Sequence, residues 1–293
     1  MKFMFVVTIL LFVSCTKESF DKQDITFSGS NTSNLIVSKM AHEFNSSRKK
    51  NIQIVGGGSE KAIKQFLSGD LFCLNTSRRL TSTEISETEA LHGKKVKEVI
   101  IGLDVVSIIV NPKIGVGELS ITQIKEVFQG LITNWKELGG PDMPIHVYGR
   151  DNSSGTYHFM KQKFAPEGFL KNYRVKSNSK EIVSAIKNDI GGFAYTDIAS
   201  ISSKKHFPIL DVWPINISVE GGQAISPFEN LAVLNGLYPL SRPLYQYFVD
   251  YNCKDVNEFI QFELSEKGQE IIYQNGFYKL QPFHIQLNRK NGF

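Results

Sequence analysis

The sequence predicts an α/β protein of two lobes, each a mixed sheet flanked by helices. Strand-like apolar runs alternate with helical stripes from Ile25 onward, and two sets of βα units follow one another along the chain. The 293 residues are 41% hydrophobic, which suffices for one large or two medium cores and excludes a disordered or collagen-like chain. At this length two lobes are favoured over one.

The N-terminus has the pattern of an export signal. Lys2 precedes the apolar run Phe3–Val13, which is shorter than the about 20 residues that a helix needs to cross a bilayer. Residues 1–14 are therefore predicted to be a removable signal peptide. Phe12-Val13-Ser14-Cys15 resembles a bacterial lipobox, with Phe12 where that motif prefers Leu, and predicts Cys15 as the lipid-bearing residue. An ordinary cleaved signal containing Cys15 is the alternative.

The rest of the composition bears on location and partners. Residues 15–24 form a polar spacer, so the mature chain is expected to lie outside the cytoplasm, tethered by lipid to a bacterial membrane. Lys and Arg number 33 against 29 Asp and Glu, and they do not gather in one cluster, so no nucleic-acid partner is predicted. Cys73 and Cys253 are too few for a disulfide framework. They are expected to be small buried apolar residues, with a mutual disulfide as the alternative.

The first part of the chain predicts a βαβαβ unit. Ile25–Ser28, Asn51–Val55 and Leu71–Asn75 have the apolar character of strands. Between them lie helical stripes for which Ser33 and Ser59 are the expected N-caps. This order implies a parallel sheet, in which ligands bind at the carboxyl ends of the strands.

Further elements follow after residue 95. Val96–Ile101 and Val105–Val110 are predicted as two strands separated by Gly102-Leu103-Asp104. Ser120 and Gln123 form a capping box for a helix that ends at Gly130. The remaining predicted segments are a strand at Ile145–Tyr148, helices at Ser154–Phe164 and Ser179–Lys187, strands at Gly192–Tyr195 and Tyr245–Asp250, and a helical stretch at Asp255–Tyr273.

Four loops share an unusual content of Gly, Ser and Thr. They cover residues 28–32, 57–59, 76–78 and 150–156, and all but the third come directly before a predicted helix. A helix start presents unpaired backbone N–H groups and the positive end of the helix dipole, so several of them together can bind an anion. Arg150 is the one cation expected there, and its planar guanidinium fits a tetrahedral oxyanion. A single Ser or Thr before a helix is more often only an N-cap.

Signatures of enzymes and cofactor sites are not found in the sequence. No dinucleotide fingerprint, P-loop or Gly-x-Ser-x-Gly elbow occurs, and the six histidines have no metal-ligand spacing. No catalytic residue, cofactor or metal is therefore predicted. His158 is expected on a helix surface, with a position beside the ligand as the alternative. Trp135 and Trp213 are expected in the core.

Two stretches carry a resemblance to a known family. Leu119–Asp142, with Asn134-Trp135-Lys136-Glu137 inside it, and Gly149–Thr156, with its Arg-x-x-x-Ser-Gly-Thr pattern, closely resemble the phosphate-binding component (PstS-like) of bacterial phosphate ABC transporters. Further marks of that family follow in the same order, namely Gly57-Gly58-Ser59, Thr76-Ser77-Arg78, residues 191–195 and residues 238–244. The resemblance covers about Ile25 to Leu280.

The resemblance implies a type II periplasmic-binding-protein fold that encloses phosphate between its lobes. It implies residues 25–104 and 241–293 as lobe 1 and residues 105–240 as lobe 2, joined by hinge strands. It also implies a monomer that presents inorganic phosphate to the permease subunits of a membrane transporter. The expected phosphate ligands are Ser30, Asn31, Thr32, Ser59, Ser77, Arg150, Ser154, Gly155 and Thr156.

Two departures from the family pattern leave alternatives open. Some members have an Asp where Ser77 aligns, as acceptor for a phosphate proton, and an Asp where this chain has Asn152, as anchor for the arginine. Asp151 is the candidate substitute for that anchor. A receptor for sulfate or molybdate therefore remains an alternative. A surface lipoprotein that binds a macromolecular partner is a separate alternative, from another class of function. A phosphatase is disfavoured because no metal set or activated nucleophile can be assembled.

Overall fold

The computed structural model describes residues 25–203, 207–219 and 221–293. The predicted signal peptide at 1–14, Cys15 and the spacer at 15–24 lie outside the described residues. Within these described ranges, no helix has the length and apolar character to cross a membrane.

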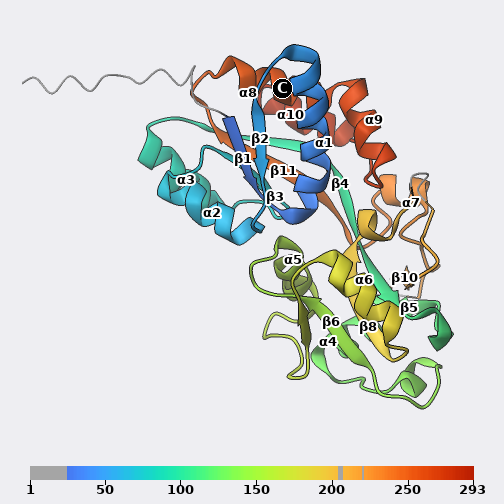
Figure 1. Ribbon diagram of the computed structural model, residues 1–293. Coiled ribbons are helices and arrows are strands. Elements are labelled where there is room, and N and C mark those ends of the chain that lie inside the picture. Colours follow the sequence, from blue (N-terminus) through green and yellow to red (C-terminus); the bar gives the residue numbers. More distant parts are fainter. Residues whose placement is uncertain (1–24, 204–206, 220) are drawn as a thin grey trace, which may run out of the picture.

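The two lobes of the predicted fold are visible in Figure 1. Lobe 1 contains one part of a continuous sheet, in the strand order β2-β1-β3-β11-β4. β1 pairs in parallel with β2 and β3, whereas β11 is antiparallel to both β3 and β4. The strands are β1 (Ile25–Gly29), β2 (Ile52–Val55), β3 (Cys73–Thr76), β4 (Val96–Val110) and β11 (Ser241–Val249).

Helices cover both faces of the sheet in lobe 1. Phe44 of α1 packs with Phe259 of α8 on one face, and Phe66 of α2 packs with Leu74 and Tyr247 on the other. Asn288 of α10 bonds the backbone N–H and C=O of Ile100. The helices are α1 (Asn31–Arg48), α2 (Ser59–Ser68), α3 (Ser82–His92), α8 (Lys254–Leu264), α9 (Glu266–Gln274) and α10 (Pro282–Lys290).

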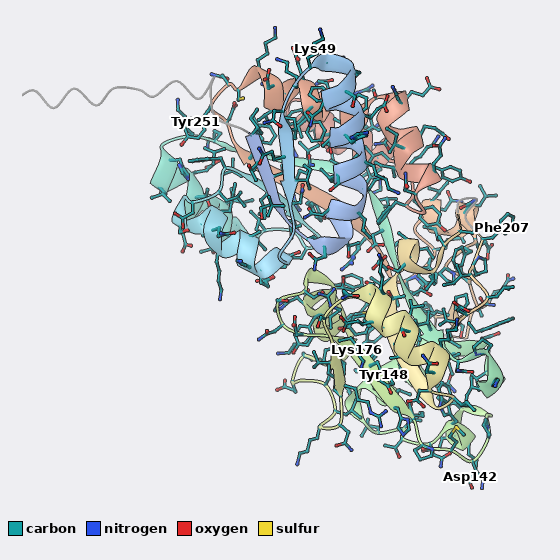
Figure 2. The ribbon with its side chains drawn as sticks, viewed as in Figure 1. Lys49, Asp142, Tyr148, Lys176, Phe207 and Tyr251 are labelled. Atoms are coloured by element: carbon teal, nitrogen blue, oxygen red, sulfur yellow. The ribbon has the colours of Figure 1, made fainter. Side chains whose placement is uncertain are left out.

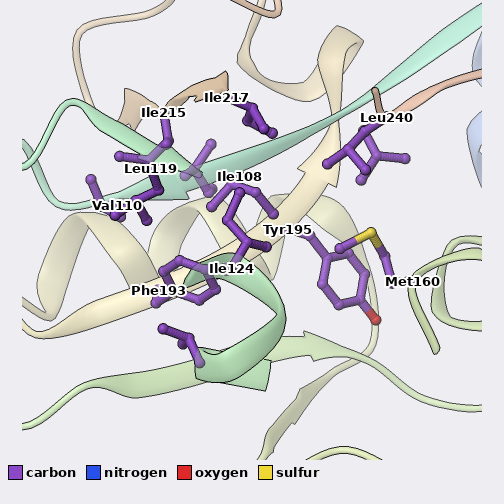
Figure 3. Close-up of a cluster of buried hydrophobic side chains, with 14 of the residues drawn as sticks. Ile108, Val110, Leu119, Ile124, Met160, Phe193, Tyr195, Ile215, Ile217 and Leu240 are labelled. Atoms are coloured by element: carbon purple, nitrogen blue, oxygen red, sulfur yellow. The ribbon is translucent and has the colours of Figure 1, made fainter. Parts of the chain in front are cut away.

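Lobe 2 contains the other part of the sheet, in the order β4-β8-β6-β7, and a separate β10-β5 pair. Its core gathers side chains such as Ile108, Phe193 and Tyr195, all of them fully buried (Figure 3). Its strands are β5 (Glu118–Ser120), β6 (His146–Arg150), β7 (Arg174–Lys176), β8 (Gly192–Asp197), β9 (Trp213–Pro214) and β10 (Asn216–Ser218). Its helices are α4 (Ile121–Gln129), α5 (Gly155–Phe164), α6 (Ser179–Asn188) and α7 (Asn230–Leu234), with 3-10 turns at Pro112–Ile114, Trp135–Leu138 and Ile198–Ile201.

One strand, β4, connects the two parts of the sheet. The sequence predicted two strands with a break at Gly102-Leu103-Asp104, and this prediction is wrong. These three residues pair with Leu244, Pro243 and Arg242 of β11, so the strand continues through them. β4 pairs with β11 up to Val105 and with β8 from Val106 onward, so it passes directly from lobe 1 to lobe 2.

Several other boundaries differ from the prediction for identifiable reasons. The N-cap of α1 is Ser30, whose hydroxyl accepts from Ser33 N, rather than Ser33, and the N-cap of α2 is Gly58 rather than Ser59. The predicted helical stretch 255–273 is two helices, because Ser265 ends α8 and its hydroxyl caps α9. The helices α3, α7 and α10 were not predicted.

The predictions for the tryptophans and cysteines have mixed outcomes. Trp135 is fully buried and donates from Nε1 to Gly191 O, as expected for a core residue. Trp213 is 53% exposed, so its prediction as a core residue is wrong. Cys73 and Cys253 are free thiols. Cys73 is buried as expected, whereas Cys253 is only partly buried.

Candidate functional site

Three serines of lobe 1 meet at the carboxyl edge of its parallel strands. Ser30 follows β1, Ser59 begins α2 just after β2, and Ser77 follows β3. The Oγ of Ser77 lies 2.8 Å from Ser30 Oγ and 3.5 Å from Ser59 Oγ. All three side chains are buried. The predicted convergence of these loops is therefore present.

Glycines allow the close approach of these loops. Gly29 has φ +150°, and a Cβ there would lie 1.8 Å from Asn75 O, so only glycine fits between the ends of β1 and β3. Gly58 has φ +93°, and its Cβ would lie 2.6 Å from Ser153 O. Since Ser153 belongs to lobe 2, this second contact is one between the lobes.

The N-terminus of α5 faces these serines from lobe 2. Ser154 is its N-cap, with the hydroxyl accepting from Tyr157 N, and Gly155 and Thr156 form its first turn. A Cβ at Gly155 would lie 2.7 Å from both Ser59 Oγ and Ser77 Oγ. The positive ends of α2 and α5 thus point at one small space, which an anion would stabilise.

The first turns of α1, α2 and α5 have no unpaired acidic side chain that could take the place of a bound anion. Neither α1 nor α5 has an acidic residue in its first turn. The first turn of α2 contains Glu60, but its carboxylate bonds the Arg78 guanidinium at 2.7 Å. The dipoles of α1 and α5 therefore have no protein carboxylate to offset them within their own first turns.

Arg150 ends β6 and is 5% exposed. Its backbone N–H donates to the Tyr195 hydroxyl oxygen at 3.0 Å, and its C=O accepts from the Tyr173 hydroxyl at 2.8 Å. Burial raises the pKa of Tyr195 to about 12, so this phenol stays neutral. In contrast, Arg150 Nε has no hydrogen-bond partner among the described residues. The backbone of Arg150 is therefore fixed, while its guanidinium keeps a buried donor free.

Residues 151–158 do not supply the expected anchor for Arg150. The Asp151 carboxylate accepts from Ser153 N at 3.0 Å and from Ser153 Oγ at 2.5 Å, so it caps its own loop. Asn152 O lies 2.8 Å from His158 Nε2, and this ring nitrogen is 3.8 Å from Glu60. His158 is thus on the helix surface, at the contact between the lobes.

Asn31, Thr32 and Arg150 line a cavity of about 320 Å³ beside the serines. The cavity reaches the N-terminus of α6, where Asp197 accepts from Ser179 Oγ at 2.5 Å. Asn31 is exposed, and its Oδ1 accepts from Gly57 N at 3.2 Å, so it joins the first loop to the second. The other predicted ligands are buried. Larger hollows of about 580 and 730 Å³ are lined by other residues of lobe 2.

Near Arg150, the side chains of Tyr148, Asp189 and His146 form a separate hydrogen-bonded network. Tyr148 and Lys176 lie on the paired strands β6 and β7, with Lys176 Nζ 5.7 Å from the centre of the Tyr148 ring (Figure 2). The Tyr148 hydroxyl donates to Asp189 at 2.7 Å, and Asp189 also pairs with His146. These polar groups have hydrogen-bond partners among themselves, whereas Arg150 Nε has none among the described residues.

A second buried arginine, Arg242, was missed by the sequence analysis. Its guanidinium pairs with Asp104 at 2.7 Å and also donates to Thr156 Oγ1 at 2.8 Å. Burial raises the pKa of Asp104 to about 6, although the Arg242 charge opposes this shift. The available signal was an Arg and an Asp within two mainly apolar segments. Their pairing across β11 and β4 cannot be read from the sequence.

No group of three or more potential metal ligands occurs among the described residues. The candidate site is made of helix N-termini, hydroxyls and guanidinium groups. A family model for the PBP superfamily domain matches residues 16–267. The chain belongs to this superfamily.

Members of the PBP superfamily with curated names support the more specific resemblance. The chain is 25% identical over 247 residues to the phosphate-binding protein PstS of Pseudomonas aeruginosa, covering 78% of this chain and 74% of that protein. It is 29% identical over 252 residues to PstS of Staphylococcus epidermidis, covering 82% and 74%. With PstS of Borreliella burgdorferi it shares 25% identity over 295 residues, covering 94% and 96%. The predicted resemblance to phosphate-binding components is confirmed.

Solved structures of superfamily members confirm the predicted fold. A putative phosphate ABC transporter substrate-binding protein of Clostridium perfringens, with bound phosphate, has a TM-score of 0.76 and 28% identity, covering 88% of this chain and all of that one. A phosphate transport receptor of Vibrio cholerae, at 24% identity, has a TM-score of 0.71 and shares the fold. The two-lobed α/β architecture is therefore that of a type II periplasmic binding protein.

Proposed function

We propose that this chain binds inorganic phosphate between its two lobes and delivers it to the permease of an ABC transporter, without catalysing a reaction. The observation that carries the proposal is the meeting of the α2 and α5 N-termini around Ser59, Ser77 and Gly155. The free buried donor of Arg150 and the names of the relatives support it. Backbone N–H groups, hydroxyls and one guanidinium suit the oxygens of a tetrahedral anion.

The proposed ligands are the nine residues predicted from the sequence, and they divide by chemistry. The hydroxyl groups surround the anion from both lobes, the N–H groups of the α5 first turn point at it, and Arg150 supplies positive charge. Ser77 Oγ lies between two other hydroxyls, so it is the group proposed to accept the proton of hydrogen phosphate. The nine are Ser30, Asn31, Thr32, Ser59, Ser77, Arg150, Ser154, Gly155 and Thr156.

The proposed mechanism is closure of lobe 1, residues 25–104 with 241–293, against lobe 2, residues 105–240. The passage of β4 from one sheet partner to the other at Val105 and Val106 supports this division. The contact of Gly58 with Ser153 O supports an approach of the lobes beside the anion. Because each lobe holds only part of the ligand set, the anion binds the closed form more tightly and stabilises it.

The location and anchoring are also proposals. The sequence pattern at residues 1–14 and Cys15 supports export, cleavage and lipid attachment, which would hold a monomeric receptor at the outer side of a bacterial membrane. The relatives named as transporter binding proteins are consistent with that place.

A sulfate receptor is the second candidate, and Ser77 is the observation that favours it. A carboxylate at that position would repel fully ionised sulfate, whereas a hydroxyl can donate to it. Calorimetric titration of protein stripped of bound anion distinguishes the two. We expect phosphate to bind with one site per chain and more tightly than sulfate or molybdate. Equal or tighter binding of sulfate would overturn the assignment to phosphate.

A further inference from the structure

Arg242 occupies a special place where the chain passes between the lobes. It lies at the start of β11, directly opposite Asp104 of β4. Next to this position the pairing partner of β4 changes from β11 to β8. Its side chain is 4% exposed and that of Asp104 is fully buried. A charged pair in such a position needs a reason beyond packing, because burial of charge is unfavourable.

Three contacts fix the plane of the Arg242 guanidinium. Nε and Nη2 both donate to Asp104 Oδ2, at 3.1 and 2.7 Å. The guanidinium carbon lies 5.3 Å from the centre of the Phe159 ring of α5. With the plane set in this way, Nη2 also donates to Thr156 Oγ1 at 2.8 Å. A lysine ammonium could not make this set of contacts, because it has no planar fork.

The contact with Thr156 limits which way its hydroxyl proton can point. A threonine hydroxyl has one proton to donate and two lone pairs to accept with. Since Nη2 occupies one lone pair of Thr156 Oγ1, the proton points away from Arg242 and can be donated to an anion bound at the N-terminus of α5.

We infer that Arg242 is a positioning residue of the anion site, which acts by holding the Thr156 hydroxyl as a donor to the bound anion, with Asp104 holding Arg242. This inference rests on the proposed phosphate site. It also connects the crossing strands to the first turn of α5 through one side chain. The buried Nη1 of Arg242, which has no partner among the described residues, shows that this guanidinium is not saturated by the protein as a purely structural ion pair would be.

A double-mutant cycle in phosphate binding tests the inference on the full-length mature chain. The variants are Arg242→Gln, Thr156→Val and the two combined, with dissociation constants measured by titration with inorganic phosphate. We expect each single variant to weaken binding by about threefold to tenfold, the loss of one hydrogen bond. The double variant is expected to lose about as much as the weaker-binding single variant, because both changes remove the same donor.

Controls separate this role from general effects of charge and stability. Arg48→Gln removes an exposed arginine that also lies over a phenylalanine ring, 5.6 Å from the centre of Phe44, at the far end of α1, and it is expected to bind phosphate like the native chain. Thermal unfolding without phosphate shows whether each variant is folded. If Arg242→Gln does not fold, Arg242→Lys takes its place in the cycle, with the same expectation.

The outcomes distinguish the two proposals. If the losses of the two single variants multiply in the double variant, or if the Arg242 variant binds like Arg48→Gln, Arg242 does not act through Thr156 and the inference is overturned. The proposed function survives that result, because the native chain still binds phosphate. A native chain that does not bind phosphate overturns both.

Discussion

At the scale of single residues, the arginines near the site differ in whether a protein carboxylate pairs with their guanidinium group. Arg78 directly follows Ser77, but its guanidinium bonds Glu60 at 2.7 Å and Glu84 at 2.8 Å. Its charge is therefore neutralised within lobe 1. Arg150 makes no such pair among the described residues and retains a free Nε. A buried cation without a protein counterion is the pattern expected where the ligand supplies the negative charge.

This difference predicts the order of two substitutions. Arg150→Ala is expected to weaken phosphate binding by about 2–5 kcal/mol, the loss of one partner of a buried charged pair. Ser59→Ala removes a neutral donor and is expected to cost about 0.5–1.5 kcal/mol. These values correspond to about 30-fold to several thousand-fold and to about twofold to tenfold in dissociation constant. If titration of the folded variants gives Ser59→Ala the larger effect, hydroxyl and helix donors dominate and the role of Arg150 is smaller than proposed.

A second prediction at this scale concerns Glu263, which is fully buried in α8. Its Oε1 accepts from Gln246 Nε2 at 3.1 Å, while Oε2 has no partner among the described residues. Burial raises the pKa of Glu263 well above its usual value of about 4.5, although the bond from Gln246 opposes this. Its contribution to stability is therefore complete below pH 4.5 and is lost as pH rises through the raised pKa.

Glu263→Gln should remove this pH dependence. At pH 8 the free energy of unfolding of the variant is expected to exceed that of the native chain by about 1–3 kcal/mol, which raises its unfolding temperature. This difference in the free energy of unfolding should vanish near pH 4. Glu87→Gln, the same change at an exposed position of α3, is the control and should have little effect. A native chain that is at least as stable as Glu263→Gln at pH 8 would show that the buried carboxyl group does not titrate as described.

At the scale of elements, the site depends on how closely helix starts approach one another. The first turn of α5 touches Ser59 and Ser77 through Gly155, which has no side chain to hold them apart. Gly155→Ala would place a methyl group 2.7 Å from both hydroxyl oxygens. The lobes then cannot reach the closed contact, and phosphate affinity is expected to fall by about 1–3 kcal/mol, or roughly fivefold to a hundredfold.

The matched control for this prediction is Gly117→Ala. A Cβ at Gly117 would lie 3.4 Å from its nearest neighbour, Trp213 Nε1, which is an ordinary contact. This variant should bind phosphate like the native chain. Titration of both variants decides the matter, and native-like affinity for Gly155→Ala would mean that the α5 first turn does not approach lobe 1 in the bound state.

Several elements with local signals could be predicted from the sequence, whereas those fixed by distant pairing could not. The helix α3 was missed even though Thr81 and Glu84 form a capping box at its start and Gly93 ends it. The capping box at Ser120 and Gln123 and the stop at Gly130 define α4 as predicted, because these signals act within one turn. The break predicted within β4 is absent because β11, more than a hundred residues away, pairs with Gly102 and Asp104. The contact of Arg242 with Thr156 was missed for the same reason.

At the scale of the whole molecule, the predicted anchor and the predicted closure are independent features. The proposed attachment depends on lipid at Cys15. Cys15→Ala is expected to release the protein from membranes and leave phosphate affinity unchanged. Partitioning between detergent and water tests this. If the variant still enters the detergent phase, another membrane-binding surface must exist.

The central claim is that one anion is held between two lobes and draws them together. Small-angle X-ray scattering on protein stripped of anion, before and after saturation with phosphate, measures this directly. The account predicts a smaller radius of gyration with phosphate, because Arg150 and the α5 first turn of lobe 2 and the serines of lobe 1 satisfy the anion only together. An unchanged radius of gyration in a sample that calorimetry shows to be saturated would contradict it.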